Sequence, residues 1–519
     1  MTINRKRKIL ALVLGVLVLG AAVTAGTLQS GRGFGDFWGP LYGAQPEDSK
    51  TSAQADTVSA RADTAQAVSP ANSMLLRWNG ISIDASGLDH TPVAPGENRV
   101  FGEQVGPCRA ARAIAIVHIA MFESLNSIVG GFKSYVGFLR TKAPASSDAA
   151  IAQSAHDTLA ALWPSQKPAF DQKLAADLAA IPAGQARNNG VNIGQKAALA
   201  ILALRANDGS QHAEPRVGID FITSNAAGKW RQDPISHHPL ALGARWKEVT
   251  PFVLASAHQF RVPPPPPMNS PAYFDAYHEV KILGGDGIIT PTVRTPEQSE
   301  IGIYWAYDGT PSMCAPPRLY NQLAVHIALQ MGTSGINLAR LLALANMAMS
   351  DAGIAIWESK YFYQVWRPVT AIREADPGTG PSGTGDGNPD TIGDLTCAPM
   401  GAPASNLMGP NFSPPFPAYP SGHAGFGGAL FQILREFYGT DNIPFTFVSD
   451  EFNGITKDNG GNIRPLIPRS FSSLSQAEEE NGQSRIYLGI HFGFDKTQGI
   501  AQGRNVGHAV IKRVFGPTN

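Results

Sequence analysis

The chain has 519 residues, which is enough for a large core and for one to three domains. Its 41 Lys and Arg residues balance its 41 Asp and Glu residues, so the chain lacks the net positive charge that favours nucleic acid, and we expect no such partner. Charged residues make up only 16% of the chain, whereas Gly (54) and Pro (40) are abundant, which predicts helices joined by long, rigid loops.

The N-terminus has the features of an export signal. Residues 5–8 are all basic, and residues 9–23 follow without a charge. Val23-Thr24-Ala25 is typical of a cleavage site, so we predict a signal peptide over residues 1–25 and export to the periplasm or beyond the cell. An uncleaved signal would instead anchor the chain in the membrane. We expect no further apolar run of spanning length, and hence no stable membrane span after cleavage.

Residues 26–73 are expected to form a disordered tether between the signal and the folded part. From about Ala44 to Asn72 the sequence is rich in Ala, Ser, Gln, Thr and Asp and lacks aromatic residues. We therefore expect the folded part to begin near Met74.

Apolar residues at helical spacing dominate the rest of the chain. They predict helices over residues 109–129, 151–162, 169–178, 193–204, 271–282, 319–331, 338–363, 424–438, 477–488 and 501–515. Five consecutive prolines, Pro263–Pro267, predict a stiff connector between an N-terminal helical region (74–262) and a C-terminal domain (268–519). No convincing run of alternating strand residues appears, so the expected fold class is all-α.

The three cysteines are too few for a disulfide scaffold and too widely spaced for a zinc site. They are Cys108, Cys314 and Cys397. At most one disulfide can form among them, and the sequence leaves its existence open.

Two cations seven residues apart begin a candidate anion site. On one helix, Lys360 and Arg367 would lie two turns apart on the same face, about 10 Å along the axis, and Pro368 would end that helix. Their long side chains can converge on one small anion. Taken alone, such a pair is more typical of solvated cations on an exposed face.

The segment Pro420–His423 precedes an apolar helix. Ser421 is expected to cap that helix, where free backbone N–H groups bind anions, and Gly422 lets an oxygen approach the backbone closely. A capping turn is common by itself. His423 makes this one unusual, because an imidazole beside a bound anion can move a proton near neutral pH.

A third segment adds a guanidinium and a second imidazole. Arg485 presents a fork that suits two oxygens of an anion. On one continuous helix His491 would lie about 240° away from Arg485, so we expect a helix break or an arginine that wraps around. Asp495 can accept the His491 ring N–H and fix its tautomer. A lone histidine here is more often a packed residue, but the three segments together predict a site for a tetrahedral oxyanion.

These segments resemble the signature Lys-x6-Arg-Pro, Pro-Ser-Gly-His and Ser-Arg-x5-His, which vanadium-dependent haloperoxidases share with type 2 phosphatidic acid phosphatases. Four further stretches are similar to haloperoxidases in particular: residues 304–309, 316–322, 351–357 and 416–419. The last of these is similar to the chloroperoxidase form. The resemblance covers about residues 269–516, and it implies two bundles of four helices around the site.

The resemblance implies one orthovanadate per chain as cofactor, with hydrogen peroxide, a halide ion and a small organic acceptor as partners. It implies that His491 bonds the vanadium and that His423 and Lys360 are catalytic. The groups that would hold the vanadate oxygens are Lys360, Arg367, Ser421, Gly422 and Arg485. Trp357 and Phe416 would shape the halide pocket, and Asp308 would pair with Arg485. Asp495 as the residue that orients His491 rests on spacing alone.

One alternative is an exported acid phosphatase with the same cage. In that enzyme His491 would form a phosphohistidine and His423 would protonate the leaving oxygen, but the matches at Trp357 and Phe416 favour the haloperoxidase. A non-enzymatic oxyanion-binding protein needs no His423 and explains the sequence less well. The halide, the organic acceptor and the oligomeric state, a homo-oligomer included, are left open.

Overall fold

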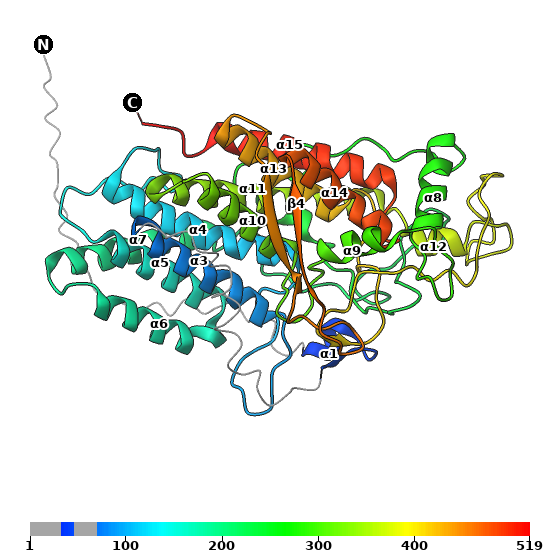
Figure 1. Ribbon diagram of the computed structural model, residues 1–519, viewed down its shortest axis with the longest axis horizontal. Helices are drawn as coiled ribbons and strands as arrows, with labels where there is room; N and C mark the ends of the chain where they lie inside the picture. Colours follow the sequence, from blue (N-terminus) through cyan, green and yellow to red (C-terminus); the bar gives the residue numbers. More distant parts are fainter. Residues whose placement is uncertain (1–32, 46–69, 519) are drawn as a thin grey trace, which may run out of the picture.

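The computed structural model describes residues 33–45 and 70–518, and this part of the chain is mostly α-helical (Figure 1). The helices before the proline connector are α1 (Phe34–Trp38), α3 (Pro70–Asp89), α4 (Pro107–Val129), α5 (Ser147–Leu162), η3 (Pro164–Gln166), α6 (Lys167–Ala180), α7 (Gln185–Arg205) and η4 (Trp246–Glu248). Those after it are α8 (Pro271–Leu283), α9 (Pro296–Tyr304), α10 (Pro316–Gln330), α11 (Gly335–Tyr363), α12 (Pro368–Arg373), α13 (Gly422–Tyr438), α14 (Leu474–Tyr487) and α15 (Gly493–Arg513). The predicted signal peptide lies outside the described residues.

Helix α11 lies at the centre of the molecule and positions the site. It packs against α4, α13 and α15, with α5 and α7 beyond α4 (Figure 1). Its side chains are buried almost without a break from Leu338 to Tyr361, because apolar residues surround the helix instead of forming one stripe. One hydrophobic core runs through α4 and α11, so it contains residues from both sides of the proline connector. The proposed domain boundary at that connector stays a prediction.

Within residues 33–45 and 70–518, two helices are long and apolar enough to cross a membrane, which the sequence expectation missed. They are α4 and α11, with mean hydropathies of 1.3 and 1.2. In the folded chain, 89% and 94% of these apolar windows are buried inside the protein. Both helices therefore serve as core helices in this structure.

The all-α fold class is confirmed, although two small antiparallel sheets accompany the helices in the described residues. The larger sheet pairs β3 (Phe445–Asn453) with β4 (Leu466–Phe471), and Phe445 lies opposite Phe471. The expectation of no strands is wrong here. Side chains alternate between buried and exposed along the first residues of β3, where Phe445 and Phe447 face the core. This alternation is too short to stand out from the surrounding helical pattern.

Part of the predicted tether is folded. Residues 33–45 form α1 and β1 (Gly43–Ala44), and β1 pairs with β2 (Leu407–Met408). Trp38 is buried, with its ring centroid 5.1 Å from that of Phe412, and an indole buried in this way anchors the segment through a large apolar contact. Because α3 also begins at Pro70, the tether prediction is wrong for residues 33–45 and 70–73. Residues 46–69 lie outside the described part.

The three cysteines are buried free thiols. Cys314 contacts Ser86 of α3, with 2.9 Å between Sγ and Oγ, and Cys108 lies 3.8 Å from the Gly353 carbonyl oxygen of α11. The disulfide that the sequence left open does not form.

Candidate functional site

Lys360 and Arg367 approach each other from two different helices. Helix α11 ends at Tyr363, and Gln364 follows in the left-handed conformation with a φ of 53°. Arg367 is the N-cap of α12, and Pro368 is its first residue. The prediction of one continuous helix ended by Pro368 is therefore wrong. A proline has a fixed φ that suits the first turn of a helix, so Pro368 begins one here.

A loop before α13 holds both cations in place. The Lys360 ammonium donates to the carbonyl oxygens of Pro417 and Ala418, at 2.8 and 2.9 Å. Arg367 donates from Nε to the Phe416 carbonyl oxygen at 2.9 Å. Arg367 Nη1 also donates to the Ile490 carbonyl oxygen at 2.8 Å and contacts His491 Nε2 at 3.0 Å. One ammonium hydrogen of Lys360 and the Nη2 hydrogens of Arg367 therefore remain for a ligand.

Ser421 and Gly422 begin α13 as the sequence predicts. Ser421 is the N-cap, and its hydroxyl accepts from the Ala424 N–H at 3.4 Å. Its own N–H donates to the Asp495 carbonyl oxygen at 3.0 Å, which joins α13 to α15. A Cβ at Gly422 would lie 3.3 Å from the Trp357 indole, so glycine keeps the backbone close to that ring.

A helix break separates Arg485 from His491, as the sequence predicts. Helix α14 ends at Tyr487 and α15 begins at Gly493, so His491 lies in the connection. His491 Nδ1 lies 2.8 Å from an Asp495 carboxylate oxygen, so the Nδ1–H donates to the carboxylate. The predicted pairing is therefore present, although His491 precedes the helix instead of sharing a face of it with Asp495. The pairing leaves the lone pair on His491 Nε2, which accepts from Arg367 Nη1 at 3.0 Å.

His423 and Arg485 meet at one carboxylate. Arg485 Nη2 lies 2.7 and 2.8 Å from the two carboxylate oxygens of Asp308, which is the predicted pair. His423 Nε2 lies 3.8 Å from the same carboxylate and donates to the Ala306 carbonyl oxygen. His423 Nδ1 is therefore the nitrogen that can exchange a proton with a group in the site.

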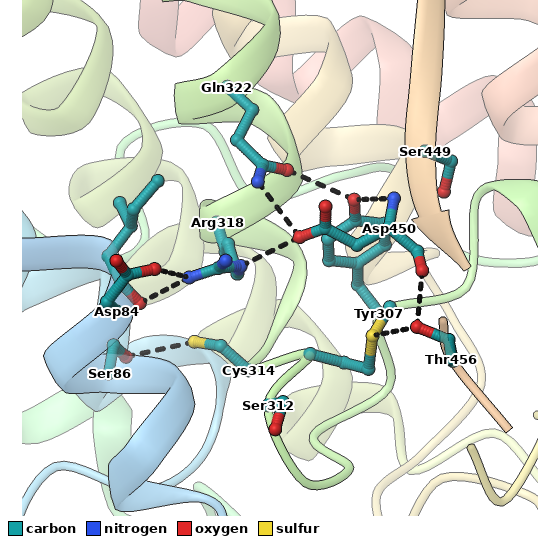
Figure 2. Close-up of polar contacts among 12 residues, drawn as sticks. Asp84, Ser86, Tyr307, Ser312, Cys314, Arg318, Gln322, Ser449, Asp450 and Thr456 are labelled. Atoms are coloured by element: carbon teal, nitrogen blue, oxygen red, sulfur yellow. Dashed lines mark hydrogen bonds and ion pairs between the residues drawn. The ribbon is translucent and has the colours of Figure 1, made fainter. Parts of the chain in front are cut away.

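A polar network holds Tyr307, the residue directly before Asp308 in the sequence (Figure 2). Arg318 of α10 lies 3.0 Å from the carboxylates of Asp84 in α3 and Asp450 in β3. The Asp450 N–H donates to the Tyr307 hydroxyl at 2.6 Å, and Tyr307 directly precedes Asp308. Contacts among α3, α10 and β3, which are distant in the sequence, thus help to position Asp308, the partner of Arg485.

Some of these residues line a cavity of about 40 Å³, room for a few water molecules and hence for a small anion, whereas Lys360, Arg367, Ser421 and Asp495 lie behind its lining. Gly422, His423, Arg485 and His491 line one end. Its apolar wall includes the predicted halide residues Trp357 and Phe416, whose ring centroids are 4.8 Å apart. The wall residues that the sequence analysis missed include Phe37, Trp38, His238, Leu242, Phe412 and Phe426. The three aromatic residues among 34–38 were the available signal, because a disordered tether rarely carries so many.

Burial and mutual repulsion disfavour the charged forms of the cationic side chains in the site. Lys360, Arg367 and Arg485 are each at most 2% exposed. Burial, together with the neighbouring Arg367, lowers the pKa of Lys360 well below its usual range. Burial also lowers the pKa of Arg367, to about 9, and it lowers the pKa of His491, where Arg367 and Lys360 add to the effect. A bound anion would relieve this repulsion and favour the charged forms.

The donor set fits an oxyanion. Arg367 Nη2 and the Nε and Nη1 of Arg485 are buried and have no hydrogen-bond partner. A buried guanidinium N–H without an acceptor is costly, and the oxygens of a tetrahedral anion are the acceptors that such donors require. Within residues 33–45 and 70–518, no group of three or more His, Cys, Asp or Glu side chains is arranged to hold a bare metal ion. The donor set therefore suits a tetrahedral oxyanion.

The affinity of the site for sulfate is expected to fall as the pH rises. At low pH Lys360 already carries its proton, but above its lowered pKa anion binding must take up a proton, which costs up to about tenfold in affinity per pH unit. Calorimetric titration with sulfate between about pH 6 and 10 measures this slope, because sulfate itself does not titrate there. Lys360→Met should bind sulfate more weakly at pH 6 and show a flatter slope. An unchanged slope in Lys360→Met would assign the titration to another group.

Comparison with known proteins agrees with this chemistry. A family model described as the VCPO second helical-bundle domain matches residues 340–518. The vanadium chloroperoxidase of Curvularia inaequalis is 31% identical over an alignment of 506 positions, gaps included, and the alignment covers 81% of this chain and 78% of that protein. The fold is similar to a bacterial vanadium-dependent iodoperoxidase (TM-score 0.65, 22% identity, 84% of this chain and 96% of the other). It is also similar to a holo-type bacterial vanadium-dependent chloroperoxidase (TM-score 0.58, 17% identity, 80% and 93%). By this extent of identity to the Curvularia enzyme, the chain belongs to the vanadium-dependent haloperoxidase family.

Proposed function

We propose that this protein oxidises a halide ion with hydrogen peroxide on a vanadate cofactor, and that the oxidised halogen then halogenates a small organic acceptor. The observation that carries the proposal is the set of partnerless guanidinium donors beside the His491 lone pair and an aromatic pocket. The 31% identity to a vanadium chloroperoxidase supports the same reading.

The residues divide into ligand, oxygen-binding and supporting groups. His491 would bond the vanadium through Nε2, with Asp495 holding the ring in the required tautomer. The groups that would hold the vanadate oxygens are Lys360, Arg367, Ser421, the Gly422 N–H and Arg485. When bound, vanadate supplies a Lewis acid that activates peroxide without changing its own oxidation state.

The protein's own part in catalysis is proton transfer and fixed charge. His423 Nδ1 takes a proton from hydrogen peroxide and returns it to the departing oxygen, because Ala306 occupies Nε2. The Lys360 ammonium lies 5.1 Å from the centre of the Phe416 ring and stabilises negative charge in a site shielded from water. Asp308 keeps Arg485 in position. Trp357 and Phe416 present a dry wall to the halide.

An assay with and without vanadate tests the proposal. The protein is purified without phosphate, loaded with orthovanadate and given peroxide, bromide or iodide, and a phenol-type indicator. We expect halogenation that requires vanadate, and no turnover of an aryl phosphate at a comparable rate. Hydrolysis of the aryl phosphate by the vanadate-free protein, with no halogenation after loading, would instead establish the acid phosphatase. Chloride, bromide and iodide assayed in parallel then determine the halide.

We also propose that the protein is exported from the cytoplasm. The basic residues 5–8, the uncharged residues 9–23 and the small residues before position 26 support a cleaved signal. Mass spectrometry of the protein recovered from its host should find a mature N-terminus near residue 26. A chain that starts at Met1 and sediments with membranes would show an uncleaved anchor.

A further inference from the structure

The indole of Trp357 is held by a segment far from it in the sequence. The Trp357 Nε1–H donates to the Leu242 carbonyl oxygen at 3.0 Å, and the Tyr361 hydroxyl donates to the same oxygen at 3.0 Å. The Leu242 N–H in turn donates to the Pro415 carbonyl oxygen at 2.9 Å, directly before Phe416. One peptide segment therefore connects Trp357 to the residue before Phe416, and these two aromatic residues both line the cavity.

Gly243 leaves room for the indole. Its φ is +78°, and a Cβ at this position would lie 2.2 Å from Trp357 Cδ1 and 2.4 Å from Nε1. No heavy atom tolerates such a distance, so any larger residue must displace either the backbone or the ring. The ring cannot move freely, because Phe416 and Phe426 pack against it with centroids at 4.8 and 6.0 Å.

A buried ion pair fixes Gly243 from the other side. The Gly243 N–H donates to a Glu214 carboxylate oxygen at 2.6 Å. The other carboxylate oxygen of Glu214 lies 3.1 Å from Arg109 Nε, and both side chains are at most 12% exposed. A carboxylate that accepts a backbone N–H and a guanidinium at once is confined in both position and orientation.

We infer that Gly243, held by Glu214, is a positioning residue that sets the place of the Trp357 indole and thereby the affinity for the halide. This inference rests on the proposed function, in which Trp357 borders the halide. The Trp357 N–H is already used by Leu242, so the indole offers an anion its ring edge, which carries partial positive charge. That edge favours an anion only where the ring is correctly placed.

Gly243→Ala is the direct test. We expect the KM for bromide to rise about tenfold, while the KM for peroxide and the vanadate affinity change by less than about threefold. Crystals soaked in bromide should show lower anomalous occupancy beside Trp357 than the unmodified protein does. Gly194→Ala is the matched control: a Cβ there would lie 2.6 Å from the Ala150 carbonyl oxygen, away from the site, and all these quantities should stay unchanged.

Glu214→Gln keeps the inference testable if Gly243→Ala fails to fold. It removes the charge that pairs with Arg109 but keeps the shape of the side chain and an acceptor for Gly243, so a smaller rise in the bromide KM is expected. Combining Gly243→Ala with Trp357→Phe should add less than the two single effects together, because both act on one ring. Equal changes in the bromide and peroxide KM, or full additivity, would overturn the inference. Absence of halide oxidation in the unmodified protein would instead refute the proposed function.

Discussion

His491→Ala is expected to abolish vanadate binding. The loss of affinity should exceed about 100-fold, because changes to residues that only support a metal ligand typically cost about 10- to 100-fold. His491 is the group whose Nε2 lone pair faces a neighbouring guanidinium within the cage, and Asp495 fixes that tautomer. No other described imidazole combines this burial with a carboxylate partner on Nδ1 and an accepting Nε2 in the cavity wall. Calorimetric titration of the purified variant with orthovanadate measures the loss.

Two further variants control this result. Asp495→Asn keeps the ligand but weakens its orientation, so its affinity should fall between those of the unmodified protein and His491→Ala, by about 10- to 100-fold. His508 is an exposed histidine on α15 that contacts Glu436 at 2.6 Å, and His508→Ala should bind vanadate normally. Normal vanadate affinity in His491→Ala would mean that another group bonds the metal.

His423→Ala should separate turnover from binding. The variant is expected to bind vanadate with nearly unchanged affinity and to lose about 10²- to 10⁴-fold in kcat, the usual contribution of a positioned acid–base group. The reason is structural: His423 is held by Ala306 and approaches Asp308, whereas the partnerless guanidinium donors that hold oxygens belong to Arg367 and Arg485. Titration with orthovanadate and halide oxidation assays on the same sample measure both quantities.

His423→Gln is the conservative companion of this variant. It keeps a polar side chain of similar reach but cannot act as a base near neutral pH, so its kcat should remain as low as that of His423→Ala. If His423→Ala and His491→Ala lose vanadate affinity equally, the division of labour between the two imidazoles is wrong.

The site was largely predictable from the sequence because its chemistry is concentrated in three short segments. Ser421–His423 lie together at the start of one helix. Arg485 lies at the end of α14, and His491 lies in the connection that follows it. The pairs Asp308 with Arg485 and His491 with Asp495 are both present in the structure. Residue types that can bind an oxyanion limit the arrangements so strongly that order and spacing were enough to propose the cage.

The errors arose where local conformation departs from average propensity. The apolar pattern predicted a helix that ends at residue 363, as α11 does, but the shared face expected for Lys360 and Arg367 required a helix that continued past the left-handed Gln364. No periodicity reveals a single residue with positive φ. Pro368 was read as a helix end, yet a proline is equally compatible with a helix start, and only the tertiary contacts of Arg367 decide between them.

Beyond Trp357 and Phe416, the cavity wall could not be predicted, because it depends on contacts between residues far apart in the chain. Trp38, near the start of the chain, contacts Phe412 in its last quarter, and Leu242 contacts Trp357, which lies 115 positions further along the chain. Neither contact has a signature of charge or spacing. The sequence therefore identified the groups that hold the anion and two aromatic wall residues, Trp357 and Phe416, but not the wall residues contributed by distant segments.

Titration of the phosphate-free protein with orthovanadate, read out as halide oxidation by peroxide, determines whether catalysis depends on one vanadate per chain. We expect activity to be absent at the start, to rise linearly with added vanadate and to saturate at a one-to-one ratio of vanadate to chain. Halide oxidation that is independent of vanadate, or no halide oxidation at saturating vanadate in a protein that hydrolyses an aryl phosphate, would show that the protein is not a vanadate-dependent haloperoxidase.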